Sequence, residues 1–237
     1  GETDDNFKLQ SKNKSYFFKI YPKKTDPKFV EFQSQLLLNL NTNKKTANNN
    51  LTLDEKCYAT FLDKENHIRY FRMNDWIQGR LWSSVNPINS SLRKELGSES
   101  AKLIIKLNQT KLDYKRDDFD WDLSNYLWIE RYYKKFDIGR KRKNIIKNLL
   151  ENLKNNDSKY KRLRKRLIHN DLNDNNIIVS EDLKNPKILG FIDFGDCIKS
   201  QLINELAITC TYGIINSLNP LNSACDIVKG FNQEIPV

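Results

Sequence analysis

The sequence predicts an α+β fold of two lobes, a small β-rich N-lobe over residues 1–75 and a larger, mainly helical C-lobe over residues 76–237. Before residue 75 the apolar residues alternate or cluster in short β-forming runs around one helical stretch, whereas most later apolar residues recur at helical spacing. The chain also has 12 Phe, 10 Tyr and 4 Trp, which supply the large apolar side chains of a packed core.

In the N-lobe, "NFKLQSKN" and "KSYFFKIYP" predict a hairpin with the turn "SKNK". Asp26 and Pro27 then supply a helix start signal. The polar stretch "NTNKKTANNN" predicts a loop, and "CYATFL" and "HIRYFRM" predict a second strand pair around "DKEN". The helix between the two strand pairs presents one apolar face, made of Phe29, Phe32, Leu36, Leu37 and Leu40.

A hinge at residues 74–79 leads into the C-lobe. Helical patterns follow in "SSLRKELGSESAKLIIKLNQTKL", where Gly97 is a weak point, and in "DFDWDLSNYLWIERYYKKF", "IIKNLLENLKNN" and "LINELAITCTYGIINSL". Between the last two patterns, residues 177–179 and 188–192 predict two buried strands. The C-lobe is therefore expected to be helical around one small hairpin.

The most basic region of the chain spans residues 134–166. Its apolar residues recur at helical spacing, so we expect its basic residues to form a solvated helix face. An electrostatic funnel for an anionic ligand is the first alternative, and a nucleic-acid surface is the weaker one because aromatic stacking platforms are not interleaved with the basic residues. The apolar residues in question are Ile145, Ile146, Leu149, Leu150 and Leu153.

Composition excludes several classes of protein. No run of about 18 apolar residues occurs, so no membrane span is expected. The N-terminal "GETDDNFKLQ" lacks the basic and apolar regions of a signal peptide. Cys57, Cys197, Cys210 and Cys225 form no CxxC pair, which favours reduced thiols and a cytoplasmic protein over disulfides or zinc.

Two acidic clusters adjoin the most strand-like segments of the chain. In "IHNDLNDNNIIV", His169, Asp171 and Asn176 have the spacing H-x-D-x-x-x-x-N and precede an apolar strand. The next strand ends at Asp193, which begins a D-F-G triplet. A carboxylate at the end of a buried strand is costly unless it is paired or binds a cation. Carboxylate and amide oxygens suit Mg²⁺, so the pattern predicts a metal site.

This spacing matches the protein-kinase template, in which an Asp accepts a hydroxyl proton while an Asn and a second Asp hold the metal. The alternative is a pair of loops with Asx-turns that cap a hairpin. A kinase also needs a strand lysine that reaches the nucleotide phosphates. Lys19 in "YFFKI" has that position, and Glu31 or Gln33 on the following helix could hold it.

The chain resembles the aminoglycoside phosphotransferase and choline kinase-like superfamily, and within it the hydroxylysine kinase group, which also occurs fused to class III aminotransferases. The resemblance rests on "HNDLNDNNIIV" and "GFIDFGDCIKSQLINELAI", with support from "NFKLQSKNKSYFFKI", "EFQSQLLLNL", "KRDDFDWDLSN" and "IVKGFNQEIP". It implies a protein-kinase-like bilobal fold in which Asp171 is the base, Asn176 and Asp193 bind Mg²⁺, Lys19 binds the phosphates of ATP or GTP, and His169 supports the catalytic loop.

The resemblance also implies that "DDNF", which contains Asn6 and Phe7, is a remnant of the loop that covers the phosphates. The sequence departs from the family in three ways. Asn170 replaces a usual Gly, and Asn tolerates left-handed backbone angles. Gln33 falls where many relatives have a Glu, so Glu31 could substitute. The first N-lobe strand is missing and the last C-lobe helices are short, which predicts a truncated N-lobe and a fragment or truncated gene product.

The phosphoryl acceptor is expected to be a small amino acid or amine whose ammonium needs a partner. Asp196 is the preferred candidate because it follows the metal Asp closely, and Glu205 and the stretch 117–122 with Trp121 are the others. Trp121 and Trp128 are seven residues apart, so they could instead be core residues of one helix face.

These observations predict a small-molecule kinase that transfers the γ-phosphoryl group of ATP or GTP to a hydroxyl of an acceptor such as 5-hydroxylysine. Trp76, near the hinge, either contacts the nucleotide base or packs. The main alternative is a catalytically impaired kinase-like fragment, or a binding module of a larger enzyme that is fused to or associated with an aminotransferase. A basic nucleic-acid binder is the third hypothesis.

Overall fold

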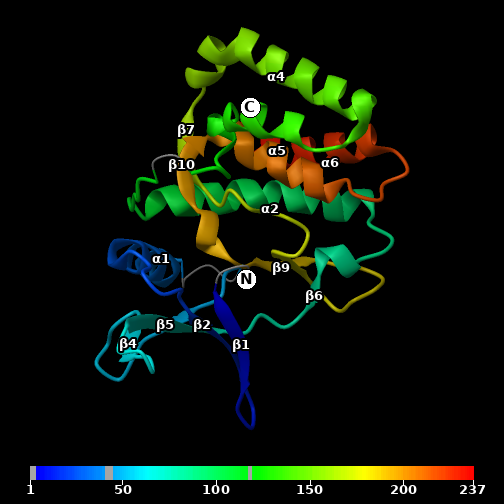
Figure 1. Cartoon of the computed structure of the whole chain (residues 1–237). Helices are drawn as coiled ribbons and strands as arrows, with labels where there is room; N and C mark the ends of the chain where they lie inside the picture. Colours follow the sequence, from blue (N-terminus) through cyan, green and yellow to red (C-terminus); the bar gives the residue numbers. More distant parts are fainter. Residues whose placement is uncertain (1–3, 41–44, 117–118) are drawn as a thin grey trace.

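The computed structural model describes residues 4–40, 45–116 and 119–237, which form two lobes (Figure 1). The described part of the N-lobe has a five-stranded antiparallel sheet in the order β1-β2-β5-β3, with β4 also paired to β5, and helix α1 (Pro27–Asn39). The predicted hairpin, helix and second strand pair are confirmed. The strands are β1 (Asp5–Gln10), β2 (Ser15–Ile20), β3 (Asn49–Asn50), β4 (Ala59–Leu62) and β5 (Ile68–Asp75).

Local chemistry explains these N-lobe elements. The Ser11 N–H donates to the Lys14 carbonyl at 2.8 Å and closes the hairpin turn. The Asp26 carboxylate accepts from the Lys28 N–H at 3.0 Å and caps α1, while Pro27 occupies the first turn. Strand alternation then places Lys19 of β2 on one face of the sheet, directly opposite a residue of each neighbouring strand.

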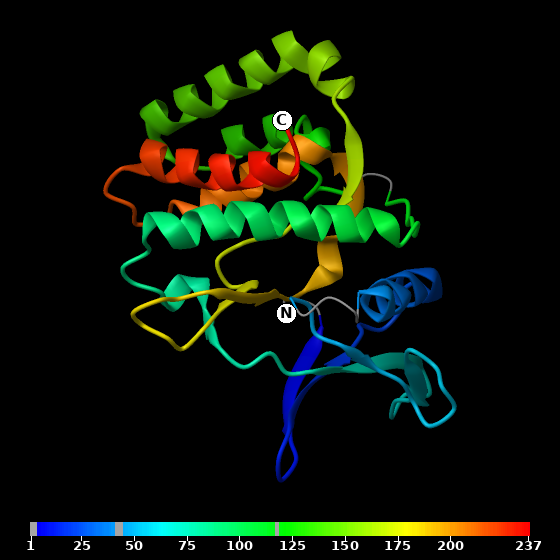
Figure 2. The ribbon, with the colours of Figure 1, turned by 180° about the vertical axis from the view of Figure 1, so that it is seen from behind.

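The C-lobe combines two small sheets with a helical body. The sheets are β6-β8-β9 and β7-β10, and helices α2, α5 and α6 lie side by side (Figures 1 and 2). The predicted strands at 177–179 and 188–192 are confirmed as β8 and β9. No helix in the described ranges is both long and apolar enough to cross a membrane.

The C-lobe strands are β6 (Arg80–Leu81), β7 (Lys165–Ile168), β8 (Ile177–Val179), β9 (Ile188–Phe191) and β10 (Ile198–Gln201). The α-helices are α2 (Ser90–Gln109), α3 (Trp128–Tyr132), α4 (Gly139–Lys161), α5 (Leu202–Gly213) and α6 (Pro220–Glu234). Short 3₁₀ turns are η1 (Trp82–Ser84), η2 (Leu123–Asn125), η3 (Tyr133–Lys135) and η4 (Phe194–Asp196).

One apolar core joins the two lobes. It contains Leu36 of α1 and the C-cap residue Leu40, together with Leu103 of α2 and Phe194 of the D-F-G triplet, all nearly inaccessible to solvent. Helix α1 therefore packs directly on the C-lobe beside the triplet. This contact fixes which α1 side chains can reach the cleft between the lobes.

The predicted helix over 118–136 is mostly wrong. In the described part of this segment, residues 126–127 separate the short turn η2 from α3, and α3 has only five residues before the chain tightens into η3. The Asp122 carboxylate accepts from the Ser124 N–H at 2.9 Å and from the Ser200 hydroxyl at 2.7 Å. Such side-chain-to-backbone bonds compete with a continuous helix. Trp121 is 63% exposed, so the interpretation of Trp121 and Trp128 as core residues of one helix face is also wrong.

Helix α4 forms as predicted, but its apolar stripe is not buried. Only Leu150 among the five apolar residues is buried, whereas Ile145, Leu149 and Leu153 are exposed. The cause is its position at the outer edge of the C-lobe, where it contacts η3 and a small cluster around Tyr126 (Figure 1). Helical periodicity identified the apolar stripe, but it could not show whether another element of the fold packs against it.

Helices α2 and α6 cross closely at two glycines. A Cβ atom on Gly97 would meet the carbonyl oxygen of Ile227, and one on Gly230 would meet the carbonyl oxygen of Lys94. Gly97, expected to weaken its helix, lies inside an uninterrupted α2. The two glycines therefore allow the backbones to approach.

We expect Gly97→Ala to destabilise the chain by about 1–3 kcal/mol, because the strain of separating two packed helices outweighs the better helix propensity of Ala. Urea unfolding measures this difference. Gln109→Ala, at the exposed end of α2, is the matched control and should change the free energy of unfolding by less than about 0.5 kcal/mol. Equal stability of Gly97→Ala and the wild type would contradict the close crossing.

Candidate active site

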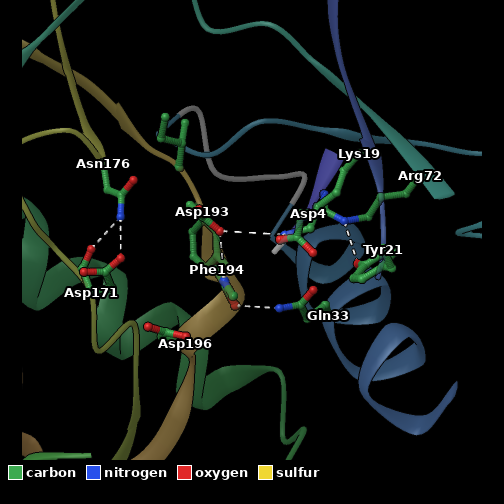
Figure 3. A network of polar contacts seen from close by, with 12 residues as sticks. Asp4, Lys19, Tyr21, Gln33, Arg72, Asp171, Asn176, Asp193, Phe194 and Asp196 are labelled. Carbon is green, nitrogen blue, oxygen red and sulfur yellow. Dashed lines mark hydrogen bonds and ion pairs between the residues drawn. The ribbon is translucent and has the colours of Figure 1, made fainter. Parts of the chain in front are cut away.

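The segment between β7 and β8 brings Asp171 and Asn176 of the H-x-D-x-x-x-x-N pattern together (Figure 3). The Asn176 amide Nδ2 donates to both the backbone oxygen and the carboxylate Oδ2 of Asp171, at 2.9 and 2.8 Å. The Asn173 amide donates to the other Asp171 oxygen at 2.8 Å. Because its Nδ2 is used in this way, the Asn176 Oδ1 atom remains available to a cation.

Asp171 is a stronger base than an ordinary aspartate. Burial, together with the nearby carboxylates of Asp196 and Asp193, raises the pKa of Asp171 to about 6 against the hydrogen bonds from Asn173 and Asn176. A carboxylate with this pKa is suited to accept the proton of an attacking hydroxyl near neutral pH.

His169 supports this loop from behind. It is fully buried, its ring lies 4.6 Å from that of Phe194, and its Nε2–H donates to the Ile192 carbonyl at 3.0 Å. The Asp171 N–H donates to its Nδ1 at 3.3 Å. Burial lowers the pKa of His169 to about 4, so the ring is neutral. Its contacts therefore hold Asp171 and the D-F-G triplet in place without proton transfer.

Asp193 reaches the cleft from the end of β9. Its backbone is left-handed, with φ 59°, and its Oδ1 accepts from the Gly195 N–H at 3.3 Å. Its carboxylate is 43% exposed and lies 3.9 Å from the Lys19 ammonium. Asp193 and Asn176 line the same cavity. Their free oxygens are the hard ligands that Mg²⁺ takes together with phosphate oxygens, so the residues present fit this ion.

Lys19 is buried on β2, with 3% of its surface exposed. Its ammonium pairs with Asp4 and faces Asp193 across the cleft (Figure 3). Directly opposite on β5 lies Arg72, which is 5% exposed and donates from Nε to the Tyr21 hydroxyl at 2.9 Å. Within the described residues, no carboxylate lies at ion-pair distance from Arg72. Two buried cations therefore share this side of the cleft.

The predicted partners of Lys19 are placed differently. Gln33 is buried, but its Nε2 donates to the Phe194 carbonyl at 3.2 Å and so links α1 to the triplet. Glu31 is exposed and accepts from Gln35 at 3.0 Å, which corrects the expectation that it could hold Lys19. Side chains two residues apart on an α-helix point about 200° apart around its axis, so Glu31 and Gln33 cannot face the same side.

Asn6 and Phe7 separate in the same way. Asn6 pairs with Lys19 in the sheet and lines the cavity, and its buried Oδ1 has no hydrogen-bond donor among the described residues. Phe7 points to the other face, is 49% exposed and lies near Phe18. Phe7 therefore does not face the cavity, which corrects its expected place in the nucleotide site.

The cavity, about 190 Å³ in volume, lies between the lobes. Asn6, Phe17 and Arg72 line it from the N-lobe sheet, and Ile178 and Phe194 from the C-lobe. The connection between the lobes contributes Trp76, which is 38% exposed and carries the Lys8 ammonium 4.5 Å from its ring centre. Polar groups thus meet at one end of a cavity whose walls are largely apolar, as in ligand sites.

The acceptor candidates also divide. Asp196 lies near Asp171 and Asp193, and burial raises its pKa (Figure 3). Glu205 is fully buried and accepts from the Asn170 N–H at 3.1 Å, so it anchors the loop that carries Asp171 and cannot contact an acceptor. Trp121 has an exposed ring, and its carbonyl accepts from the Asn170 amide at 3.2 Å.

Asn170 has the left-handed φ of 66° that its amino-acid type tolerates. Residues 117 and 118 of the acidic stretch lie outside the described residues, and Asp122 has the structural role given above. Sequence reasoning missed Arg72 and Arg116. Arg72 could have been noticed as a cation inside the apolar run "HIRYFRM", whereas nothing local marks Arg116.

A β-rich lobe, a helical lobe and a cleft that collects a lysine, two aspartates and an asparagine define the protein-kinase-like class. The chain belongs to the phosphotransferase enzyme family, whose model matches residues 1–224. It is 29% identical to a hydroxylysine kinase of Mus musculus over 177 residues, which cover 70% of this chain and 46% of that protein. It is 32% identical to a hydroxylysine kinase of Xenopus laevis over 55% of this chain and 37% of that protein.

Solved structures have the same fold. An amicoumacin kinase in complex with AMP-PNP, Ca²⁺ and Ami aligns with a TM-score of 0.69 at 18% identity, covering 99% of this chain and 71% of that one. A microcompartment-associated aminopropanol kinase aligns with a TM-score of 0.65 at 15% identity, covering 99% and 77%. The choline kinase of Streptococcus pneumoniae aligns with a TM-score of 0.58 at 17% identity, covering 100% of this chain and 75% of that one. The chain spans less than half the length of the curated relatives it matches.

We expect the anchor Glu205 to make stability depend on pH. Burial raises its pKa from 4.5 to about 7, so the folded state holds an extra proton between these values and stability falls as pH rises through this window. The loss is on the order of 3 kcal/mol. Glu205→Gln removes this titration but keeps an acceptor for the Asn170 N–H.

Urea unfolding at pH 5 and pH 8 tests this prediction. Other titrating groups, including His169, are present in both proteins, so the difference between wild type and Glu205→Gln isolates Glu205. The variant should gain on the order of 3 kcal/mol relative to the wild type on going to pH 8. A difference that is the same at both pH values would contradict the buried, protonated anchor.

Proposed function

We propose that the chain is a Mg²⁺-dependent small-molecule kinase that transfers the γ-phosphoryl group of ATP or GTP to a hydroxyl of an amino acid or amine. One observation carries the proposal. Buried Lys19 faces Asp193 across a cleft whose C-lobe side also holds Asp171 and Asn176. Phosphoryl transfer needs these groups, because its catalysis consists largely of positioning and charge stabilisation.

Each side chain has a distinct task in this proposal. Asp171 accepts the proton of the acceptor hydroxyl as the oxygen attacks the γ-phosphorus. Asn176 and Asp193 hold Mg²⁺, which neutralises phosphate charge when bound. Lys19 binds phosphate oxygens, and Arg72 adds a second positive charge on the same side. Trp76 and Ile178 give the nucleotide base an apolar site in the cavity.

Asp4 forms an ion pair with the Lys19 ammonium. A triphosphate carries more negative charge than one carboxylate and would take its place. The buried, unpaired Oδ1 of Asn6, beside Lys19, further indicates that this end of the cavity is built for polar atoms.

For the acceptor we propose a compound like 5-hydroxylysine. The curated relatives are hydroxylysine kinases, and two structural neighbours are an aminopropanol kinase and a choline kinase, whose names also denote amine-bearing alcohols. Asp196 would hold the acceptor ammonium, with the exposed Trp121 ring at the rim. Reduced thiols and the use of a nucleotide co-substrate favour the cytoplasm as the location.

Nucleotide binding gives the first test. At about 100 times its dissociation constant, Mg²⁺-AMP-PNP should stabilise the wild type by about 2.7 kcal/mol and raise its melting temperature by several degrees. Asp193→Ala should abolish this shift because a metal ligand is lost. Glu151→Ala, an exposed α4 variant far from the cleft, is the control and should keep it.

Transfer gives the second test. Asp171→Asn should keep the nucleotide-induced shift but lower phosphorylation of 5-hydroxylysine by at least about 100-fold, as loss of a general base does. Absence of a shift with both ATP and GTP analogues would refute the kinase. A shift without product for any amino acid or amine would support the binding-module alternative instead.

A further inference from the structure

Arg116 lies beside the acceptor side of the cleft. It follows α2 on the segment that runs back toward α1, and its guanidinium carbon stacks 3.5 Å from the ring centre of Phe119 and 5.1 Å from that of Phe29. Its side chain is 23% exposed. The two aromatic rings hold the planar guanidinium in a defined orientation.

Among the described residues, the contacts of Arg116 leave part of its guanidinium unused. Its Nη1 donates to the Gly195 carbonyl at 2.9 Å and lies 3.6 Å from the Asp196 Oδ1. The second distance exceeds that of a normal hydrogen bond. A guanidinium offers five N–H donors and binds carboxylates best through two parallel bonds. Arg116 is therefore a half-buried cation that can still bind a carboxylate.

Asp196 is the matching anion. Its side chain is 31% exposed. Burial, with a smaller contribution from the charge of Asp193, raises the pKa of Asp196, although the charge of Arg116 lowers it. Figure 3 shows Asp196 on the same side of the cleft as Asp171, near the expected position of the acceptor hydroxyl. A loosely paired carboxylate of this kind gains from an ammonium ligand.

We propose that Arg116 and Asp196 together recognise the head group of an α-amino acid, with Arg116 binding its carboxylate and Asp196 its ammonium. This inference rests on the proposed function and narrows its acceptor to a free amino acid with a side-chain hydroxyl. Binding exchanges one long ion pair within the protein for two ion pairs with the ligand. An amine without a carboxylate would meet Asp196 but also the uncompensated charge of Arg116, which disfavours it.

Two ligands that differ only in the carboxylate test the proposal. They are 5-hydroxy-L-lysine and 1,5-diamino-2-pentanol, titrated calorimetrically into the chain in the presence of Mg²⁺-AMP-PNP. The wild type should bind the amino acid about 10-fold to 100-fold more tightly, as expected for a charge-assisted contact. Arg116→Gln should bring the two affinities within about threefold of each other by weakening only the amino acid, and Asp196→Asn should weaken both ligands.

A purely structural role of Arg116, through the Gly195 carbonyl, would lower both affinities by the same factor, and that result would overturn the proposal. Equal or tighter binding of the diamine by the wild type, or binding of neither ligand, would also overturn it. Arg116→Lys keeps the charge and should retain only part of the preference, which provides a second folded variant. Arg131→Gln, an exposed arginine of α3, is the matched control and should keep the full preference.

Nucleotide affinity of the same proteins separates this inference from the proposed function. Both Arg116 variants should bind Mg²⁺-AMP-PNP as the wild type does, because Arg116 lies on the acceptor side. If nucleotide binds but the amino acid is not preferred, the head-group inference fails and the kinase remains. If nucleotide does not bind to the wild type, the kinase itself fails.

Discussion

The buried ammonium of Lys19 is the constraint on which the rest of the site depends. An ammonium that is 97% removed from solvent is costly unless anions surround it, and Arg72 on the next strand increases that cost. The anions come from both sides of the cleft, Asp4 from the N-lobe and Asp193 from the C-lobe. Gln33, bonded to the Phe194 carbonyl, ties α1 to the same triplet and so fixes the lobes around this charge. A cleft with two buried cations on one wall favours a polyanionic ligand.

On the C-lobe side of the cleft, the side chains that hold the 170–176 loop in place differ from those that face the ligand. His169 and Glu205 lie behind the loop of residues 170–176, where burial lowers the pKa of His169 to about 4 and raises that of Glu205 to about 7. Both pKa changes favour the neutral form of the side chain, which costs less free energy to bury than the charged form. The carboxylates that keep contact with the cleft are Asp171, Asp193 and Asp196. Supporting residues are therefore neutral and buried, and charge is concentrated where phosphate, metal and acceptor would meet.

The sequence predicted those parts that depend on local spacing. The hairpin of β1 and β2, the capped helix α1 and the H-x-D-x-x-x-x-N and D-F-G segments each follow from neighbouring residues. What it missed depends on contacts between distant segments. The rotation of α1 about its axis turns Gln33, and not Glu31, toward the C-lobe. The rotation of α5 likewise turns Glu205 toward the loop backbone. The packing of the 110–116 segment brings Arg116 to the Gly195 carbonyl. Likewise, the helical spacing of apolar residues in α4 predicted an apolar stripe, but it could not predict that this stripe is largely exposed to solvent.

A crystal structure of the chain with Mg²⁺ and AMP-PNP tests the central claim most directly. The account expects the Lys19 ammonium to have left Asp4 and to lie within about 3.2 Å of a phosphate oxygen. It also expects Asn176 and Asp193 to lie within about 2.2 Å of the metal, with the base between Trp76 and Ile178. Nucleotide bound elsewhere, or phosphates held away from Lys19 while it stays paired with Asp4, would contradict the account.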